Sequence, residues 1–152
     1  MKKLLFTSMM VFAIACSASA QTAKGTWLLG GGANFKSTDG TTVWSLTPEL
    51  GMFVKDNLAI GGTVGLSGSD GETMTNIGAF VKPYFGKAEN GKMFAKASLG
   101  SMDSQFTYGA GLGYASFLNK SVALELGANY HKMGDLPGSL GLGVGFQIHF
   151  KK

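Results

Sequence analysis

Arginine is absent from this chain, and cysteine and long apolar runs are scarce. All thirteen basic residues are lysines, whereas proteins that read nucleic acids rely on the guanidinium fork of arginine, so no nucleic-acid partner is expected. The single cysteine, Cys16, excludes an internal disulfide framework. Beyond residue 20 there is no apolar run long enough for a membrane-spanning helix, so a spanning helix is excluded there.

The first twenty residues have the three parts of a secretory signal peptide. Lys2 and Lys3 come first, an apolar run over 4–15 follows, and small residues end the segment. The apolar run is too short to anchor the chain as a spanning helix. The predicted division is a signal peptide at 1–20, cleavage between Ala20 and Gln21, and one domain at 21–152.

Cleavage would remove the only cysteine and two lysines. Without Lys2 and Lys3 the formal charge falls from +4 to +2, so the basic pI of about 9.2 says little about partners. An alternative processing site is the segment Ala13-Ile14-Ala15-Cys16, which loosely resembles a lipoprotein box and would lead to lipidation of Cys16.

Glycine is abundant, with 24 residues, yet it follows no collagen-like period. After residue 20 the chain divides into alternating segments of about nine to thirteen residues, near the length that a tilted strand needs to cross a bilayer. Short connections rich in Gly, Asn, Asp and Ser separate them, as hairpins require. We therefore predict an all-β, eight-stranded antiparallel up-and-down transmembrane β-barrel. The predicted strands are 26–35, 42–54, 58–67, 75–85, 92–100, 105–116, 121–131 and 139–150.

The chemistry of the two strand faces separates a membrane barrel from a soluble one. In the segment 139–150, bulky apolar residues alternate with Gly141, Gly143, Gly145, Gln147 and His149. A soluble barrel needs its apolar face inside and charged side chains outside. Here the apolar face carries no charge and the other face is mostly small, which favours lipid outside and a narrow lumen inside.

Aromatic residues on the apolar face gather near both ends of the strands. Because a chain that follows a signal peptide starts its first strand from the periplasm, one rim is predicted to be periplasmic. Two aromatic bands are expected where rings meet lipid headgroups. The predicted girdles are Trp27, Phe85, Tyr114 and Phe150 at the periplasmic rim, and Phe35, Trp44, Phe106, Tyr108 and Tyr130 at the opposite rim.

Four charged residues fall on the inward face within the strands: Glu49, Lys82, Lys96 and Glu125. Each lies about four to six residues from the nearest periplasmic turn, so we expect them in one layer. Two carboxylates and two ammonium groups balance, and buried charges are tolerated when they are paired. The pattern predicts a filled, salt-bridged lumen. An alternative is a narrow pore gated by exchange of these pairs.

Pro48 and Pro83 fall within predicted strands, where a missing N–H breaks a ladder bond, so we expect β-bulges there. The two histidines, His131 and His149, are predicted to point into the lumen at opposite rims with no neighbouring serine. A lipid hydrolase or acyltransferase needs a histidine beside a serine and an acid, so no catalytic residue and no enzymatic activity are expected. No spacing suits a metal and no glycine run precedes a helix, so no cofactor is expected.

Several segments carry a likeness to known proteins: the end of the signal at 18–21, Gly25-Thr26-Trp27, the turn region 48–59, the segment 123–127 and the closing segment 145–150. With them the chain resembles the outer-membrane β-barrel domain family, small barrels related in shape to the membrane domain of OmpA and to OmpX. The resemblance implies recognition of the last strand, ending at Phe150, by the barrel-assembly machinery. Lys151 and Lys152 follow that aromatic, which departs from the many members that end on it.

We therefore expect a monomeric barrel in the outer membrane of a Gram-negative bacterium, surrounded by outer-membrane lipids and with a mainly structural or membrane-integrity role. Three alternatives remain open. A surface-binding or adhesion barrel would need broader loops than the short ones predicted here. A narrow gated pore would need exchangeable charges in the lumen. A soluble periplasmic lipocalin-like carrier would need the opposite assignment of the two faces.

Overall fold

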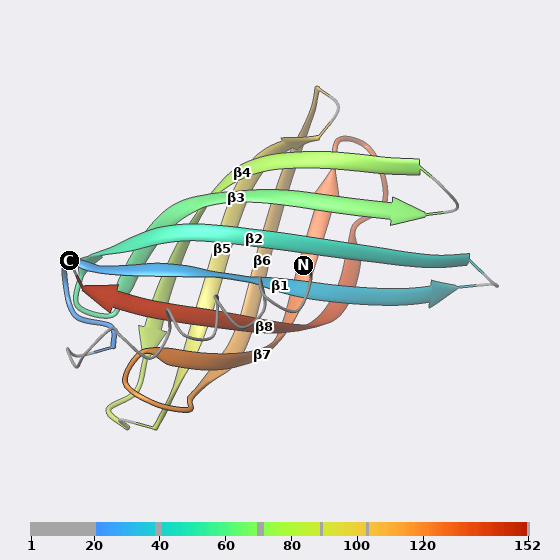
Figure 1. The fold of residues 1–152 in the computed structure, drawn as a ribbon. Helices are drawn as coiled ribbons and strands as arrows, with labels where there is room; N and C mark the ends of the chain where they lie inside the picture. The colour runs from blue at the N-terminus through green and yellow to red at the C-terminus, as the bar shows by residue number, and fades with distance from the viewer. Residues whose placement is uncertain (1–20, 39–40, 70–71, 89, 103, 152) are drawn as a thin grey trace, which may run out of the picture.

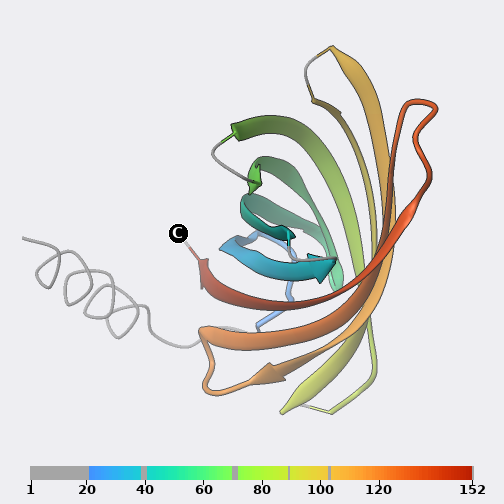
Figure 2. The ribbon, with the colours of Figure 1, turned by 90° about the vertical axis from the view of Figure 1, so that its right-hand side faces the viewer.

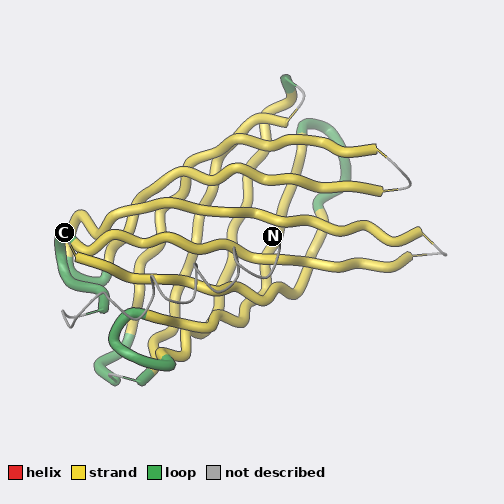
Figure 3. Tube along the Cα trace, viewed as in Figure 1, coloured by secondary structure: helices red, strands yellow, loops and turns green. Residues whose placement is uncertain are grey.

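The chain folds as a closed antiparallel barrel of eight strands in a computed structural model that describes residues 21–38, 41–69, 72–88, 90–102 and 104–151. Each strand pairs with its neighbours in sequence, and β1 pairs with β8 to close the sheet (Figures 1 and 3). The predicted fold class is confirmed. The strands are β1 (Thr26–Thr38), β2 (Thr41–Lys55), β3 (Leu58–Ser69), β4 (Glu72–Phe85), β5 (Gly91–Met102), β6 (Gln105–Phe117), β7 (Val122–Met133) and β8 (Ser139–Lys151).

The strands extend further than the sequence pattern predicted. Most of the added residues lie at the rim away from Gln21 and Lys151, where β1 continues to Thr38 and β4 starts at Glu72. The serine, threonine and glutamate residues there resemble loop composition, but pairing with the neighbouring strand continues through them. One predicted strand end was too early, because β7 begins at Val122 and not at residue 121.

The bulges predicted at Pro48 and Pro83 are wrong. The register between β1 and β2 runs unbroken through Gly31↔Pro48, and that between β3 and β4 runs through Leu58↔Pro83. Since both backbone groups of a residue in an antiparallel strand face the same neighbour, each missing N–H interrupts pairing on one side only. The register shift of β2 lies instead between Phe53 and Lys55, beside the turn into β3.

The outer surface of the barrel is apolar. Leu142 is 81% exposed, Leu140 74%, Ile77 65% and Leu112 64%. These residues lie on β4, β6 and β8, so the apolar surface extends around the curved sheet of the barrel (Figure 2). The described residues contain no helix of sufficient length and apolarity to cross a membrane.

The inside of the barrel has two different halves. We call the half near Gln21 and Lys151 the proximal half and the half near the β1–β2, β3–β4, β5–β6 and β7–β8 connections the distal half. Large buried side chains fill the proximal half, whereas the distal half contains a cavity of about 370 Å³. The lumen is therefore filled in one half only, which corrects the predicted filled lumen. The alternation of residues along a strand identifies which side chains point inward. It does not show how completely those side chains fill the lumen at each height along the barrel axis.

Glycines let the proximal half pack tightly. A side chain at Gly113 would collide with the ring of Phe94, and a Cβ at Gly61 would lie 2.8 Å from the ring of Phe80. Each ring lies across the lumen face of a neighbouring strand. Glycine is needed at the contact because any side chain there would occupy the space of the ring. The abundance of glycine thus follows in part from these ring contacts.

Candidate functional site in the barrel lumen

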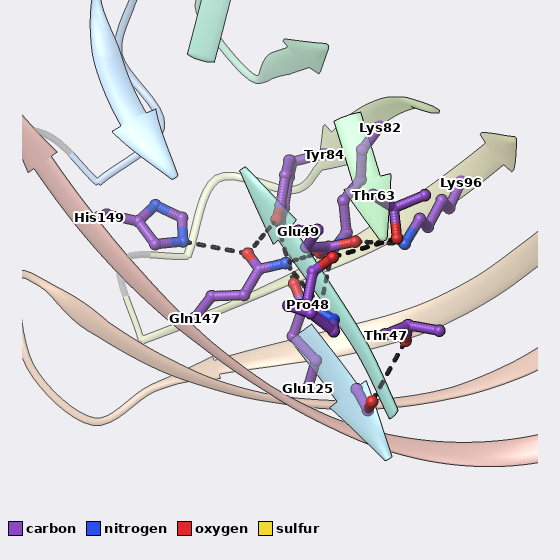
Figure 4. Close-up of polar contacts among 11 residues, drawn as sticks. Thr47, Pro48, Glu49, Thr63, Lys82, Tyr84, Lys96, Glu125, Gln147 and His149 are labelled. Carbon is purple, nitrogen blue, oxygen red and sulfur yellow. Dashed lines mark hydrogen bonds and ion pairs between the residues drawn. The ribbon is translucent and has the colours of Figure 1, made fainter. Parts of the chain in front are cut away.

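The four charged side chains predicted to share a layer lie together in the lumen (Figure 4). The Lys82 Nζ atom lies 2.6 Å from Glu125 Oε2 and 3.3 Å from Glu49 Oε1. Lys96 forms an ion pair with the other oxygen of Glu49. Three of these side chains are almost fully buried, and the Lys96 side chain is 27% exposed beside the distal cavity. The charges balance, so the group is neutral as a whole.

Two further residues complete this charge cluster, and the sequence reasoning missed both. The Gln147 Nε2 atom donates to Glu49 Oε1 at 2.7 Å and to Glu125 Oε2 at 3.0 Å. The Tyr84 hydroxyl lies 3.0 Å from Glu125 Oε1 and 2.9 Å from Gln147 Oε1, and these two acceptors share its single proton. The inward position of both residues follows from the alternation along β4 and β8, but their level does not. We refer to these six connected residues as the charge cluster: Glu49, Lys82, Tyr84, Lys96, Glu125 and Gln147.

Aromatic rings cover the proximal side of the charge cluster. Phe53 is fully buried, with its ring centroid 5.6 Å from those of Tyr84 and His149. The Phe117 ring meets His149 edge-on at 5.5 Å. The Lys82 ammonium lies 4.4 Å from the Phe94 centroid, where the ring face attracts a cation. The rings therefore exclude water from the proximal side of the ion pairs.

The segment before β1 closes the proximal end. The carbonyl oxygen of Gln21 lies 2.5 Å from His149 Nδ1, and the Thr22 hydroxyl donates to Asn57 Oδ1 at 2.7 Å. The Lys92 Nζ atom lies 2.6 Å from both of these oxygen atoms of Thr22 and Asn57. Asn57 has a φ of 64°, a left-handed conformation that asparagine tolerates in the tight β2–β3 turn. The residues directly after the predicted cleavage position thus belong to the folded barrel.

The distal cavity is lined by a mixture of small polar residues, glycines and apolar residues. Hydroxyl, amide and glycine residues from all eight strands surround it, including Thr63, Ser98, Thr107 and Asn129. The lining contains two basic residues, Lys96 and His131. Among the described residues, it contains no Asp or Glu. Because the ammonium of Lys96 is paired with Glu49, the cavity is close to neutral.

The histidines occupy the opposite rims of the lumen. His149 is buried among the proximal rings, whereas His131 lines the distal cavity. The expectation that neither histidine neighbours a serine is wrong, since His131 is the register partner of Ser139 and the backbone N–H of His149 donates to the backbone carbonyl of Ser121. Period-two alternation alone does not show which residues face each other across a hairpin. In the described part of the chain, no cluster of His, Cys, Asp or Glu could hold a metal.

The aromatic residues predicted as girdles point outward wherever their side chains are described. Those at least one third exposed are Trp44, Phe85, Phe106, Tyr108, Tyr114 and Tyr130. Trp27 and Phe150 are half-buried and lie opposite each other on β1 and β8. Phe35 belongs to β1, but its side chain is outside the described part of the chain, as are the predicted signal peptide at 1–20 with Cys16 and Ala20. The role of these aromatics as membrane girdles stays a prediction.

Solved structures share this architecture at low sequence identity. The N-terminal β-barrel domain of OprF from Pseudomonas aeruginosa matches with a TM-score of 0.66 and 12% identity, over 84% of this chain and 98% of that one. Neisserial surface protein A matches with a TM-score of 0.64 and 18% identity, over 84% and 98%. A de novo designed transmembrane β-barrel matches with a TM-score of 0.64 and 14% identity, over 85% of this chain and 98% of that one. No protein-family model and no curated protein matches the chain. The chain therefore has the fold of small eight-stranded membrane barrels.

Proposed function

We propose that this protein is a small outer-membrane barrel of a Gram-negative bacterium, exported by a signal peptide, monomeric in the bilayer and mainly structural in its role. The observation that carries the proposal is the apolar outer surface of a closed barrel whose strand-interior charges are paired inside. The fold shared with OprF and neisserial surface protein A supports the same conclusion.

The outer surface is too apolar for a protein surrounded by water. Soluble monomers seldom expose a contiguous apolar patch of more than a few hundred Å². Here exposed Leu112, Leu126, Leu140 and Leu142 occupy three consecutive strands, β6 to β8. In a bilayer the same side chains contact lipid tails, and the closed sheet leaves no unpaired strand edge in the hydrocarbon. The apolar exterior therefore disfavours the soluble lipocalin-like carrier.

The proximal half favours a structural barrel over a pore. The charge cluster joins side chains from β2, β4, β5, β7 and β8. On its proximal side lies the aromatic layer, formed by the rings of Phe53, Phe94, Phe117 and His149. An ion entering from the distal cavity would have to displace buried, mutually paired groups. Among the described residues, these paired groups and rings would oppose the passage of ions through the proximal half.

A charged substitution on the outer surface tests the membrane assignment. Leu112 is 64% exposed near the middle of β6, so Leu112→Lys would place an ammonium group in hydrocarbon, at a cost of about 2–4 kcal/mol. In a soluble barrel the same change would be nearly neutral, within about 0.5 kcal/mol. We would measure urea unfolding in liposomes and the mobility of unboiled samples on gels, with Leu112→Met as the control. A heat-dependent mobility shift in the parent and a large loss for lysine alone are expected.

Recovery of the parent in the soluble fraction, without a heat-dependent shift and with Leu112→Lys as stable as Leu112→Met, would reject the membrane assignment. Planar-bilayer recording separates the gated pore from the closed barrel. We expect no steady conductance from the parent, from Glu49→Gln or from Lys82→Met, because the aromatic layer persists in each. Appreciable conductance that changes with either substitution would favour the gated pore.

A further inference from the structure

Exposed lysines surround the proximal rim of the barrel. The residues are Lys24 before β1, Lys55 at the end of β2, Lys87 and Lys120 in the β4–β5 and β6–β7 connections, and Lys151 at the end of β8. Each connection at this rim, and the segment at each end of the barrel, thus carries an exposed lysine. Figures 1 and 3 show the β2–β3, β4–β5 and β6–β7 connections at the same end of the barrel as the C-terminus.

Few carboxylates offset this charge. In the described part of the chain Asp56 is the carboxylate at this rim, and its Oδ1 atom accepts a hydrogen bond from the backbone N–H of Lys24 at 2.8 Å. The sequence adds Glu89 in the β4–β5 connection. Lys92, held against Thr22 and Asn57, contributes a further ammonium group. The proximal rim therefore has a surplus of positive charge.

The opposite connections have the reverse composition. By sequence, the distal connections and the strand ends beside them contain Asp39, Asp70, Glu72, Asp103 and Asp135, with Lys36 and Lys132 as their basic residues. The small net charge of the chain after residue 20 therefore conceals a segregation of charge along the barrel. A composition that is nearly neutral overall gives no indication of it.

The lysines lie where lipid headgroups would meet the barrel. Lys151 directly follows Phe150, which pairs with Trp27, and Lys87 comes two residues after the exposed ring of Phe85. Aromatic rings at strand ends occupy the membrane interface, and lysine stems reach from there to the headgroups. Each lysine close to an anionic surface strengthens attraction by about fivefold at moderate salt.

We infer that the proximal rim of this barrel binds the anionic headgroups of phospholipids in the leaflet that it faces. This inference rests on the proposed membrane location and adds the class of lipid. The recognition is by charge at headgroup depth, with the lysines distributed around the rim, so it selects the sign of the headgroup and no particular acyl chain. Salt weakens it, because exposed charges are screened over about 8 Å at physiological ionic strength.

The test uses the purified barrel in nanodiscs with equal parts of phosphatidylcholine and phosphatidylglycerol of the same acyl chains. Native mass spectrometry measures the two lipids that remain bound. One variant combines Lys55→Gln, Lys87→Gln, Lys120→Gln and Lys151→Gln, and its matched control carries arginine at the same four positions. We expect phosphatidylglycerol to be enriched several-fold on the parent and on the arginine variant, and to return to the bulk ratio on the glutamine variant.

Equal retention of the two lipids by the parent overturns the inference, and so does undiminished enrichment on the glutamine variant. If inorganic phosphate abolishes the enrichment and sodium chloride of equal ionic strength does not, the rim binds free anions and the lipid assignment is rejected. A barrel that shows the heat-dependent shift but no enrichment removes this inference alone. A chain that does not enter bilayers removes the proposed function as well.

Discussion

The proximal and distal halves of the lumen are built from the same strands with the same alternation, yet one is packed and the other is open. In the proximal half, inward positions carry Leu28, Phe53, Tyr84 and Phe94, and buried ion pairs lie above them. In the distal half they carry serine, threonine, asparagine and glycine around a cavity of about 370 Å³. Barrel closure therefore does not by itself fill a lumen. The size of the inward side chains at each level decides whether the lumen is packed.

Removal of the ammonium group at the centre of the charge cluster would affect the packed half most. Lys82→Met leaves Glu125 without its lysine partner in a buried site, and breaking a buried pair in this way costs about 3–5 kcal/mol. Lys96→Met is the matched change at the border of the cavity, where the side chain is 27% exposed and Glu49 keeps Lys82 and Gln147. We expect a clearly smaller loss there. Urea unfolding in liposomes measures both, and equal losses would contradict the comparison.

Added volume distinguishes the halves next. Ala115 is fully buried in the proximal half, so Ala115→Leu would overpack it, at a cost of about 1–3 kcal/mol. Ser98 lines the distal cavity, where Ser98→Leu has room and should change the free energy of unfolding by about 0.5 kcal/mol or less. The midpoint of urea unfolding gives both values. A larger loss for Ser98→Leu would mean that the distal half is closely packed.

Single hydroxyl groups give the smallest contrast. Tyr84→Phe removes a buried donor to Glu125 or Gln147 while keeping the ring, and a hydrogen bond to a charged group contributes about 1.5 kcal/mol. Thr63→Val removes an exposed bond to the Pro48 carbonyl and should be close to neutral, within about 0.5 kcal/mol. Thermal or urea unfolding of the two variants beside the parent measures the difference. Similar losses of stability in the two variants would show that hydrogen bonds in the buried half contribute no more than those in the half that water reaches.

The sequence was sufficient to predict the fold and to find four members of the charge cluster. Alternation with period two identified Glu49, Lys82, Lys96 and Glu125 as inward, and short proximal turns allowed their level to be counted. Gln147 and Tyr84 were missed because only charged residues on the inward face indicated an ion-pair network. An uncharged amide or phenol on that face gives no such signal. The expected bulges at Pro48 and Pro83 failed because the ladder loses pairs on one side while the other side keeps the register.

By itself the sequence determined which residues face outward and which face inward, since each strand alternates independently of its neighbours. It also determined where hairpins reverse, because turn residues act locally. Only the tertiary structure decided which inward residues share a level, because strand tilt and stagger place distant positions such as Glu49 and Gln147 side by side. The tertiary structure likewise decided that aromatic rings gather in one half and leave the other open, and that the exposed lysines form one rim.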